Sequence, residues 1–190
     1  MVQENEAALF KLEKNIFLTG IMGAGKTSTG ITLARLLGVA FFDCDALISE
    51  IAGMGISDIF ERHGEAYFRR REAEVLEMLS EKKAGSCVVS TGGGAVLRPG
   101  NIEAMRKNGI IIFLDVPAAE ACDRIKDSPD RPHLQVEQPL QKLEQLLQER
   151  QPYYRQADFC VSTSGKEVEQ IAAEIMQMLK HNGWRNGCGN

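Results

Sequence analysis

An eight-residue segment near the start of the chain has the residue types and the spacing to hold the phosphates of a nucleoside triphosphate. The segment Gly20-Ile-Met-Gly-Ala-Gly-Lys-Thr27 matches the pattern G-x-x-x-x-G-K-[ST]. Glycines in this pattern let backbone N–H groups turn toward the β-phosphate, and the start of the following helix adds a favourable dipole. We therefore expect Lys26 to reach the β- and γ-phosphate oxygens and Thr27 to hold Mg²⁺.

Two carboxylates form a second candidate for chemistry. Asp43-Cys-Asp45 directly follows the apolar run 39–42, and carboxylates two residues apart at a strand end can serve one site if the backbone turns between them. One could orient the Mg²⁺ shell or accept a proton from an attacking hydroxyl, and the other could accept hydrogen bonds from hydroxyls of an acceptor substrate. The alternative is structural, because Asp45 is also placed to cap a helix that begins at Ala46.

A run of three arginines could contribute an anion-binding group. The segment Phe68-Arg-Arg-Arg-Glu72 lies on an expected helix that begins near Glu65. At about 100° per residue the three side chains cannot all face one way, so we expect one of them to face inward. The alternative is a solvated helix face with i,i+3 pairs such as Arg69 with Glu72.

Two further arginines lie near prolines. Arg131 belongs to a polar stretch, 127–139, that carries three prolines. Such a stretch can close as a lid and bring an arginine to a transferring phosphoryl group, with an ordinary surface connection as the alternative. Arg150 is expected to end a helix just before Pro152, where it could bind an anion or simply favour the helix dipole.

Three consecutive glycines, Gly92 to Gly94, follow the apolar run 87–90. Glycines after a strand serve either a flexible turn or a place where backbone approaches a ligand closely. The sequence leaves both interpretations open.

The elements that would position these residues alternate along the chain. Strands are expected at 15–19, 39–42, 87–90, 109–114 and 159–162. Helices are expected after the phosphate-binding segment as far as Gly38, from Ala46, and at 65–83, 100–107, 117–126, 139–150 and 167–180. This alternation predicts an α/β fold with a mostly parallel sheet covered on both faces and a ligand at the carboxyl ends of the strands.

Composition limits the classes of partner. The 190 residues suit one domain over residues 1–190, and the 22 basic and 26 acidic residues give a formal charge of −4. That balance offers no basic surface for nucleic acid or an anionic membrane, so we expect neither as a partner.

Residues 1–14 lack the apolar run of a secretory signal, which predicts a cytoplasmic protein. The five cysteines form no C-x-x-C pair, and we expect most of them to be buried free thiols.

Six segments together resemble shikimate kinase in residue identity, order and approximate spacing. They are Gly20 to Thr27, Phe42-Asp-Cys-Asp45, Gly64-Glu-Ala-Tyr-Phe-Arg69, Thr91-Gly-Gly-Gly94, Arg131-Pro132 and Glu149-Arg-Gln-Pro-Tyr153. The resemblance covers residues 14 to 180. It implies a three-layer P-loop kinase fold with a five-stranded parallel sheet in the order 2-3-1-4-5 and a mobile lid at about 127–139.

The resemblance also implies an activity. The chain would use ATP and Mg²⁺ to phosphorylate the 3-hydroxyl of shikimate, giving shikimate 3-phosphate in the biosynthesis of chorismate and the aromatic amino acids. We expect a monomer.

The resemblance assigns individual roles. The residues expected to bind ATP are Gly23, Ala24, Gly25, Lys26, Thr27, Ser28, Arg124 and Arg131. Those expected to bind shikimate are Asp45, Arg69, Gly92, Gly93, Gly94 and Arg150. Thr27 and Asp43 match the Mg²⁺ positions, and the catalytic residues would be Lys26, Asp43 and Arg131. The segment 163–166 lies where the family closes over the adenine ring. The expected lid reads Arg-Pro-His-Leu where the family usually has two leucines after the proline.

Other functions fit the sequence less well. Gluconate kinase shares the phosphate-binding segment and the architecture, but the paired aspartates, the three glycines and the spacing from Arg131 to Arg150 favour shikimate. A regulatory nucleotide-binding protein would be expected to lose Lys26, Asp43 or an acceptor-binding arginine, and all are present. A P-loop GTPase is disfavoured because the sequence contains no Asn-Lys-x-Asp.

Overall fold

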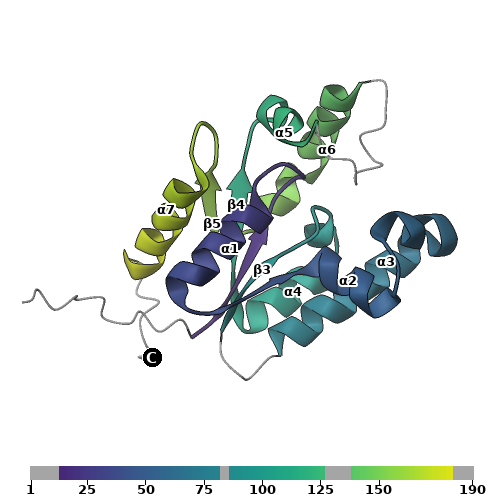
Figure 1. The fold of residues 1–190 in the computed structure, drawn as a ribbon, viewed down its shortest axis with the longest axis horizontal. Helices are drawn as coiled ribbons and strands as arrows, with labels where there is room; N and C mark the ends of the chain where they lie inside the picture. The colour runs from purple at the N-terminus through teal and green to yellow at the C-terminus, as the bar shows by residue number, and fades with distance from the viewer. Residues whose placement is uncertain (1–12, 82–85, 127–137, 182–190) are drawn as a thin grey trace, which may run out of the picture.

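A computed structural model describes residues 13–81, 86–126 and 138–181 of the chain. Five parallel strands form one sheet in the order β2-β3-β1-β4-β5, which confirms the expected order (Figure 1). The strands are β1 (Asn15–Thr19), β2 (Ala40–Asp43), β3 (Cys87–Ser90), β4 (Gly109–Asp115) and β5 (Phe159–Ser162).

Burial explains why these sequences form strands. The side chains of β1 and β3 are buried throughout, and so is β4 up to Leu114, because helices cover both faces of the sheet. Strands covered on both faces carry continuous apolar runs rather than alternating patterns. The edge strands β2 and β5 are partly exposed. In the centre, Phe17 of β1 lies between Val89 and Ile111 of the neighbouring strands.

Within the described ranges, seven α-helices surround the sheet. They are α1 (Lys26–Leu37), α2 (Cys44–Ala52), α3 (Ile56–Ser80), α4 (Pro99–Lys107), α5 (Ala118–Ile125), α6 (Pro139–Tyr154) and α7 (Val168–His181), with a short 3₁₀ helix, η1, at Ala95–Leu97. Helices α1 and α7 pack together on one face, and α3 and α4 on the other, while α5 and α6 lie together beyond the carboxyl end of β4 (Figure 1). This arrangement leaves the carboxyl ends of the central strands open to a ligand.

Two expected helix boundaries are wrong. The helix expected at 65–83 begins nine residues earlier, at Ile56, and only a break at Gly64 (φ 75°, ψ 172°) marks the expected start. The helix expected to end at Arg150 continues to Tyr154 with Pro152 inside it. Proline inside a helix removes one backbone hydrogen bond, but Tyr154 is fully buried and its packing holds the last turn in place.

The structural alternative for Asp45, a helix cap, is wrong. Strand β2 extends to Asp43, and Asp43 is the residue that caps α2. Its carboxylate oxygen Oδ1 accepts from the backbone N–H groups of Asp45 (3.0 Å) and Ala46 (3.3 Å). Asp45 therefore lies in the first turn of α2 and not at its cap.

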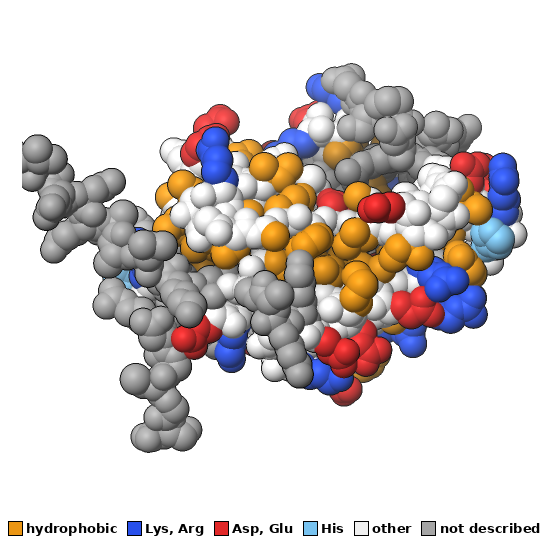
Figure 2. Space-filling model, turned by 60° about the horizontal axis from the view of Figure 1, so that its bottom comes forward, with side chains coloured by type: hydrophobic (Ala, Val, Ile, Leu, Met, Phe, Trp, Pro, Cys, Tyr) orange, Lys and Arg blue, Asp and Glu red, His pale blue; other side chains and the backbone are white. Residues whose placement is uncertain are grey.

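Figure 2 shows one face on which apolar side chains gather in the middle and charged side chains of both signs lie around them. Among the described helices, none combines the length and the apolar character that crossing a bilayer requires.

Of the described cysteines, all free, Cys44 and Cys87 are buried, Cys122 is half-buried and Cys160 is exposed, so the expectation of mostly buried thiols is met by only two.

Candidate active site

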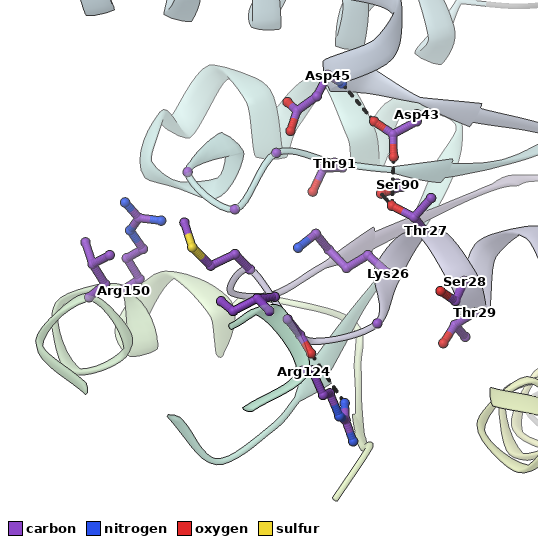
Figure 3. A pocket seen from close by; sticks show the side chains of 18 of the residues that line it. Lys26, Thr27, Ser28, Thr29, Asp43, Asp45, Ser90, Thr91, Arg124 and Arg150 are labelled. Carbon is purple, nitrogen blue, oxygen red and sulfur yellow. Dashed lines mark hydrogen bonds between the residues drawn. The ribbon is translucent and has the colours of Figure 1, made fainter. Parts of the chain in front are cut away.

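A pocket of about 1140 Å³ opens at the carboxyl ends of β1, β2 and β3. Figure 3 shows Lys26 reaching across its middle, Asp43 and Asp45 on one side, and Arg150 and Arg124 at separate places on its rim. The pocket brings together most of the residues expected to bind ligands: Gly23, Gly25, Lys26, Thr27, Ser28, Asp43, Asp45, Arg69, Gly92, Gly93, Gly94, Arg124 and Arg150. Ala24 is fully buried, and Arg131 lies outside the described residues.

The phosphate-binding segment has the strand-to-helix geometry that its motif requires. It connects β1 to α1, and three of its glycines have positive φ: Gly20 (145°), Gly23 (79°) and Gly25 (84°). Gly25 is the N-cap of α1, so the positive end of the helix dipole faces the pocket. The ammonium group of Lys26 donates to the carbonyl oxygens of Gly20 and Ile21, each at 2.9 Å. The loop therefore presents N–H groups and one cation to an anion.

Three oxygen-bearing side chains meet beside this loop. The Thr27 hydroxyl donates to Asp43 Oδ2 at 2.9 Å and lies 3.4 Å from the Ser90 hydroxyl. Asp43 thus uses one carboxylate oxygen to cap α2 and points the other at Thr27. Sequence reasoning missed Ser90, although its place at the end of β3 was a usable signal.

The pocket wall opposite the phosphate loop contains a charged pair on α3. Arg69 Nη1 lies 3.0 Å from Glu72 Oε2, and Arg69 Nη2 lies 3.1 Å from Glu65 Oε1. Arg70 and Arg71 instead lie over the Tyr67 ring. The expectation that one arginine of the run faces inward is confirmed for Arg69, and the i,i+3 pair offered as the alternative is present in the same arrangement.

Glu72 is a pocket residue that the sequence reasoning did not identify. Its side chain is fully buried, and its Oε1 has no hydrogen-bond partner within the described part of the chain. Burial raises the pKa of Glu72 above its usual value, although Arg69 opposes the shift. For Arg69, burial lowers the pKa but Glu72 and Glu65 outweigh it, so the pKa is raised and the guanidinium stays charged.

The three glycines after β3 are packed tightly against these charged side chains. A Cβ added to Gly92 would lie 2.6 Å from Glu72 Oε1, and one added to Gly94 would lie 2.6 Å from both terminal nitrogens of Arg69. At Gly93 the Cβ would lie 3.3 Å from Gly20 O and 3.5 Å from Arg150 Nη1. The packing therefore leaves no room for a side chain at Gly92 or Gly94.

The other end of the pocket is built around Arg124 of α5. Its Nη2 donates to Thr163 O (2.9 Å) and to Glu120 Oε2 (3.1 Å), and its Nη1 donates to Thr163 Oγ1 (3.2 Å). Ser164 donates to the other oxygen of Glu120 at 2.6 Å. These contacts tie α5 to the loop after β5. Gly165 and Lys166 of that loop line the pocket.

Nothing in the sequence indicated that several apolar residues belong to the pocket. Ile56 and Phe60 of α3 and Leu146 of α6 are examples. Each continues an ordinary apolar helix pattern, and only the tertiary packing brings them to the site. No cluster of three or more His, Cys, Asp or Glu side chains able to hold a metal ion occurs in the described ranges.

Comparison with known proteins gives one consistent result. The family model for shikimate kinase matches residues 22–180. The shikimate kinase of Caldanaerobacter subterraneus subsp. tengcongensis is 44% identical over 164 residues, which is 86% of this chain and 95% of that protein. The structure of Acinetobacter baumannii shikimate kinase in complex with shikimate superposes with a TM-score of 0.87 at 40% identity, covering 93% of this chain and 98% of that one.

A gluconokinase shares the fold alone. The structure from Sinorhizobium meliloti gives a TM-score of 0.56 at 17% identity, over 91% of this chain and 99% of that one. The alternative kinase considered from the sequence thus has the same architecture but little sequence in common with this chain.

Proposed function

The chain belongs to the shikimate kinase family and is an ATP-dependent kinase, and on that premise we propose how its residues bind and phosphorylate shikimate. One observation carries the assignment. A single pocket has the phosphate-binding loop at one side and, across it, two arginines and a glycine-rich loop suited to a small carboxylate. The Acinetobacter baumannii enzyme, with shikimate bound, supports shikimate as the acceptor.

ATP would bind with its phosphates on the loop from Gly20 to Thr27. The ammonium group of Lys26 would exchange its two carbonyl partners for β- and γ-phosphate oxygens, and the backbone N–H groups of Gly23, Ala24 and Gly25 would complete the cradle. The adenine ring would lie toward Arg124 and the loop after β5. Arg131 would add a second cation when residues 127–139 close over the nucleotide.

The oxygens beside the loop fit Mg²⁺. Mg²⁺ prefers hard oxygen ligands and usually takes only one or two from the protein, with water and phosphate completing the shell. The Thr27 hydroxyl and the Asp43 carboxylate, 2.9 Å apart, form such a pair. When bound there, Mg²⁺ supplies charge neutralisation at the β- and γ-phosphate oxygens.

Shikimate would bind on the opposite side of the pocket. Arg69 and Arg150 would hold its carboxylate in charge-assisted pairs, and Asp45 would accept hydrogen bonds from its hydroxyls. The backbone from Gly92 to Gly94 would approach the ring closely, since no side chain stands in the way. Glu72 would keep the Arg69 guanidinium in place for the carboxylate.

Transfer to the 3-hydroxyl would then depend on position and charge. Asp43 would orient the hydroxyl and take its proton as the new P–O bond forms and the bond from the γ-phosphorus to the bridging oxygen of ADP breaks, with ADP leaving. Lys26 and Arg131 would stabilise the negative charge on the equatorial oxygens of the transferring group. Closure over both substrates would exclude water, so that ATP is not hydrolysed.

We also propose that the chain works as a single-domain monomer in the cytoplasm. The phosphate loop, Arg69, Arg150 and the glycine-rich loop all line one pocket within a single chain, which supports a site inside one subunit. Light scattering coupled to size-exclusion chromatography tests the monomer, and a dimer at assay concentrations would contradict it.

The central experiment is ADP release from Mg·ATP with shikimate, with gluconate and without an acceptor. Release that depends on shikimate alone is expected. Release that depends on gluconate would overturn the acceptor assignment but keep the phosphate loop. No release with either acceptor, despite measurable ATP binding, would contradict the proposed reaction.

A further inference from the structure

A buried tyrosine lies directly beneath the glycine-rich loop of the pocket. Tyr154 is the last residue of α6 and has no exposed surface. Its ring stacks on Phe113 of β4, with centroids 4.8 Å apart and planes 6° from parallel. Its hydroxyl donates a 2.7 Å hydrogen bond to the carbonyl oxygen of Gly93. The ring packing fixes the hydroxyl, and the hydroxyl in turn holds the loop.

All three carbonyl groups of the loop are held by hydrogen bonds. Gly92 O accepts from the Ala95 N–H at 3.0 Å, Gly94 O accepts from the Leu97 N–H at 3.1 Å, and Gly93 O accepts from Tyr154. The first two bonds come from the adjoining 3₁₀ turn and the third comes from α6. The Gly93 carbonyl is therefore the point at which a distant helix sets the loop conformation.

A hydrogen bond that fixes a carbonyl group also fixes the direction of the N–H group in the same peptide unit. In a trans peptide the C=O of one residue and the N–H of the next point in opposite directions, and the described chain has no cis peptide bond. Tyr154 thus fixes the direction of the Gly94 N–H, as the Ala95 bond fixes that of the Gly93 N–H. Within the part of the chain that the structure describes, neither N–H donates to another residue. Both remain available to a ligand.

The same helix carries Arg150 one turn before Tyr154. Residues four apart lie on the same helix face, and the Arg150 guanidinium lies beside Gly93, in the middle of the loop. Burial raises the pKa of Tyr154 to about 12, although Arg150 opposes the shift. The hydroxyl therefore remains a protonated donor around neutral pH.

We propose that Tyr154 is a positioning residue for the acceptor: its hydroxyl holds the Gly93–Gly94 peptide against α6, so that the Gly94 N–H and the Arg150 guanidinium face the shikimate carboxylate together. This role rests on the proposed acceptor site. It predicts that loss of the hydroxyl weakens shikimate binding and leaves ATP binding unchanged, because the hydroxyl donates to the Gly93 carbonyl on the acceptor side of the pocket.

The test compares two tyrosine variants that are neighbours in sequence. Tyr154→Phe keeps the ring on Phe113 and removes only the buried hydroxyl, while Tyr153→Phe removes a hydroxyl from a partly exposed residue. We expect Tyr154→Phe to raise the shikimate KM about five- to tenfold, the effect of losing one neutral hydrogen bond. The ATP KM and kcat should stay within about twofold, and Tyr153→Phe should match the parent protein.

Two controls separate positioning from simple stability. Thermal unfolding is measured for both variants, and calorimetric titration with shikimate alone should give the same affinity ratio as KM. The ratio should also stay constant from about pH 6 to about pH 9, because the hydroxyl does not ionise there. An unchanged shikimate KM, or equal rises in the KM for both substrates together with a lower Tm, would overturn the proposal.

The Arg150→Ala variant distinguishes this proposal from the acceptor site on which it rests. A raised shikimate KM in Arg150→Ala with an unchanged KM in Tyr154→Phe would reject the role of Tyr154 alone. An unchanged KM in Arg150→Ala would reject the carboxylate site itself, and the Tyr154 proposal with it.

Discussion

Two glycine-rich loops line the same pocket, and they need glycine for different reasons. In the phosphate loop the need is conformational, since Gly20, Gly23 and Gly25 all have positive φ. At Gly25 a Cβ would meet only Thr29 Oγ1, at 3.7 Å, so space is not the constraint there. In the loop of Gly92 to Gly94 no residue has positive φ, and the constraint is the closeness of Glu72, Arg69 and Arg150 and, at Gly93, of the Gly20 carbonyl oxygen.

The difference reflects how each loop recognises its ligand. The phosphate loop turns its own N–H groups toward an anion, so its backbone conformation carries the function. The second loop has no side chains of its own, so charged side chains from α3 and α6 can converge on a small space beside it. The absence of side chains is therefore what this loop contributes to binding. Changes in the first loop should therefore act on ATP, and changes in the second should act on shikimate.

The largest effect should come from Lys26→Met in the phosphate loop. We expect kcat to fall about 10²- to 10³-fold, because a fixed cation at the transferring phosphoryl group is lost. Shikimate affinity measured without nucleotide should not change. Lys107→Met, which removes an exposed ammonium at the end of α4, serves as the control. A comparable loss of shikimate affinity in Lys26→Met would show that the two halves of the pocket are not separate.

Gly94→Ala tests the second loop by filling its space. The new Cβ would lie 2.6 Å from both terminal nitrogens of Arg69, so the guanidinium must move away from Glu72. We expect the shikimate KM to rise about tenfold to about a hundredfold, as for a lost charge-assisted hydrogen bond, with the ATP KM unchanged.

Gly100→Ala is the matched control for this substitution. A Cβ at Gly100, in the first turn of α4, would meet nothing within 4 Å. The steady-state constants of that variant should equal those of the parent. If Gly94→Ala also left the shikimate KM unchanged, close packing at this loop would have no bearing on acceptor binding.

Gly25→Ala tests the first loop by straining its backbone without causing a steric clash. Its φ of 84° costs a residue with a Cβ about 1–2 kcal/mol, while the space around it is open. We expect the ATP KM to rise by up to about tenfold and the Tm to fall, with an unchanged shikimate affinity. Kinetics and thermal unfolding measure both effects. A shikimate defect larger than the ATP defect would reverse the comparison between the loops.

Sequence reasoning predicted most of the fold because the central strands are buried on both faces. Runs such as 109–114 are continuously apolar, and each is followed by polar or glycine residues. The phosphate loop was equally predictable, since its conformation requires particular residue types in a fixed order. The helix ends were less predictable. Tyr154 holds the last turn of α6 past Pro152 by packing against Phe113, which lies far away in sequence.

The acceptor side of the site was only partly predictable, for a related reason. Arg69 and Arg150 could be proposed from the resemblance to a family, but Glu72 and Tyr154 act through contacts that only the folded chain creates. Glu72 has the spacing of an ordinary i,i+3 partner on a helix surface. Its complete burial depends on how α3 packs against the loop after β3.

The smallest effect expected is a change in how stability depends on pH, caused by Glu72→Gln. Burial raises the pKa of Glu72 in the folded protein, so the folded state keeps this proton to a higher pH than the unfolded state does. The contribution of Glu72 to the free energy of unfolding is therefore full below its ordinary pKa of 4.5 and falls as pH rises through the folded-state pKa. Glutamine does not titrate, so the variant should show a flatter dependence.

Urea unfolding of both proteins between about pH 4.5 and about pH 7.5 measures this difference. The stability of Glu72→Gln relative to the parent should increase with pH and then level off, while Glu77→Gln, an exposed position on the same helix, should show no such trend. A constant difference across the range would mean that Glu72 ionises alike in both states. In that case the attraction of Arg69 would fully offset the effect of burial on the pKa of the carboxylate. Arg69 and Glu72 would then form an ion pair at every pH tested.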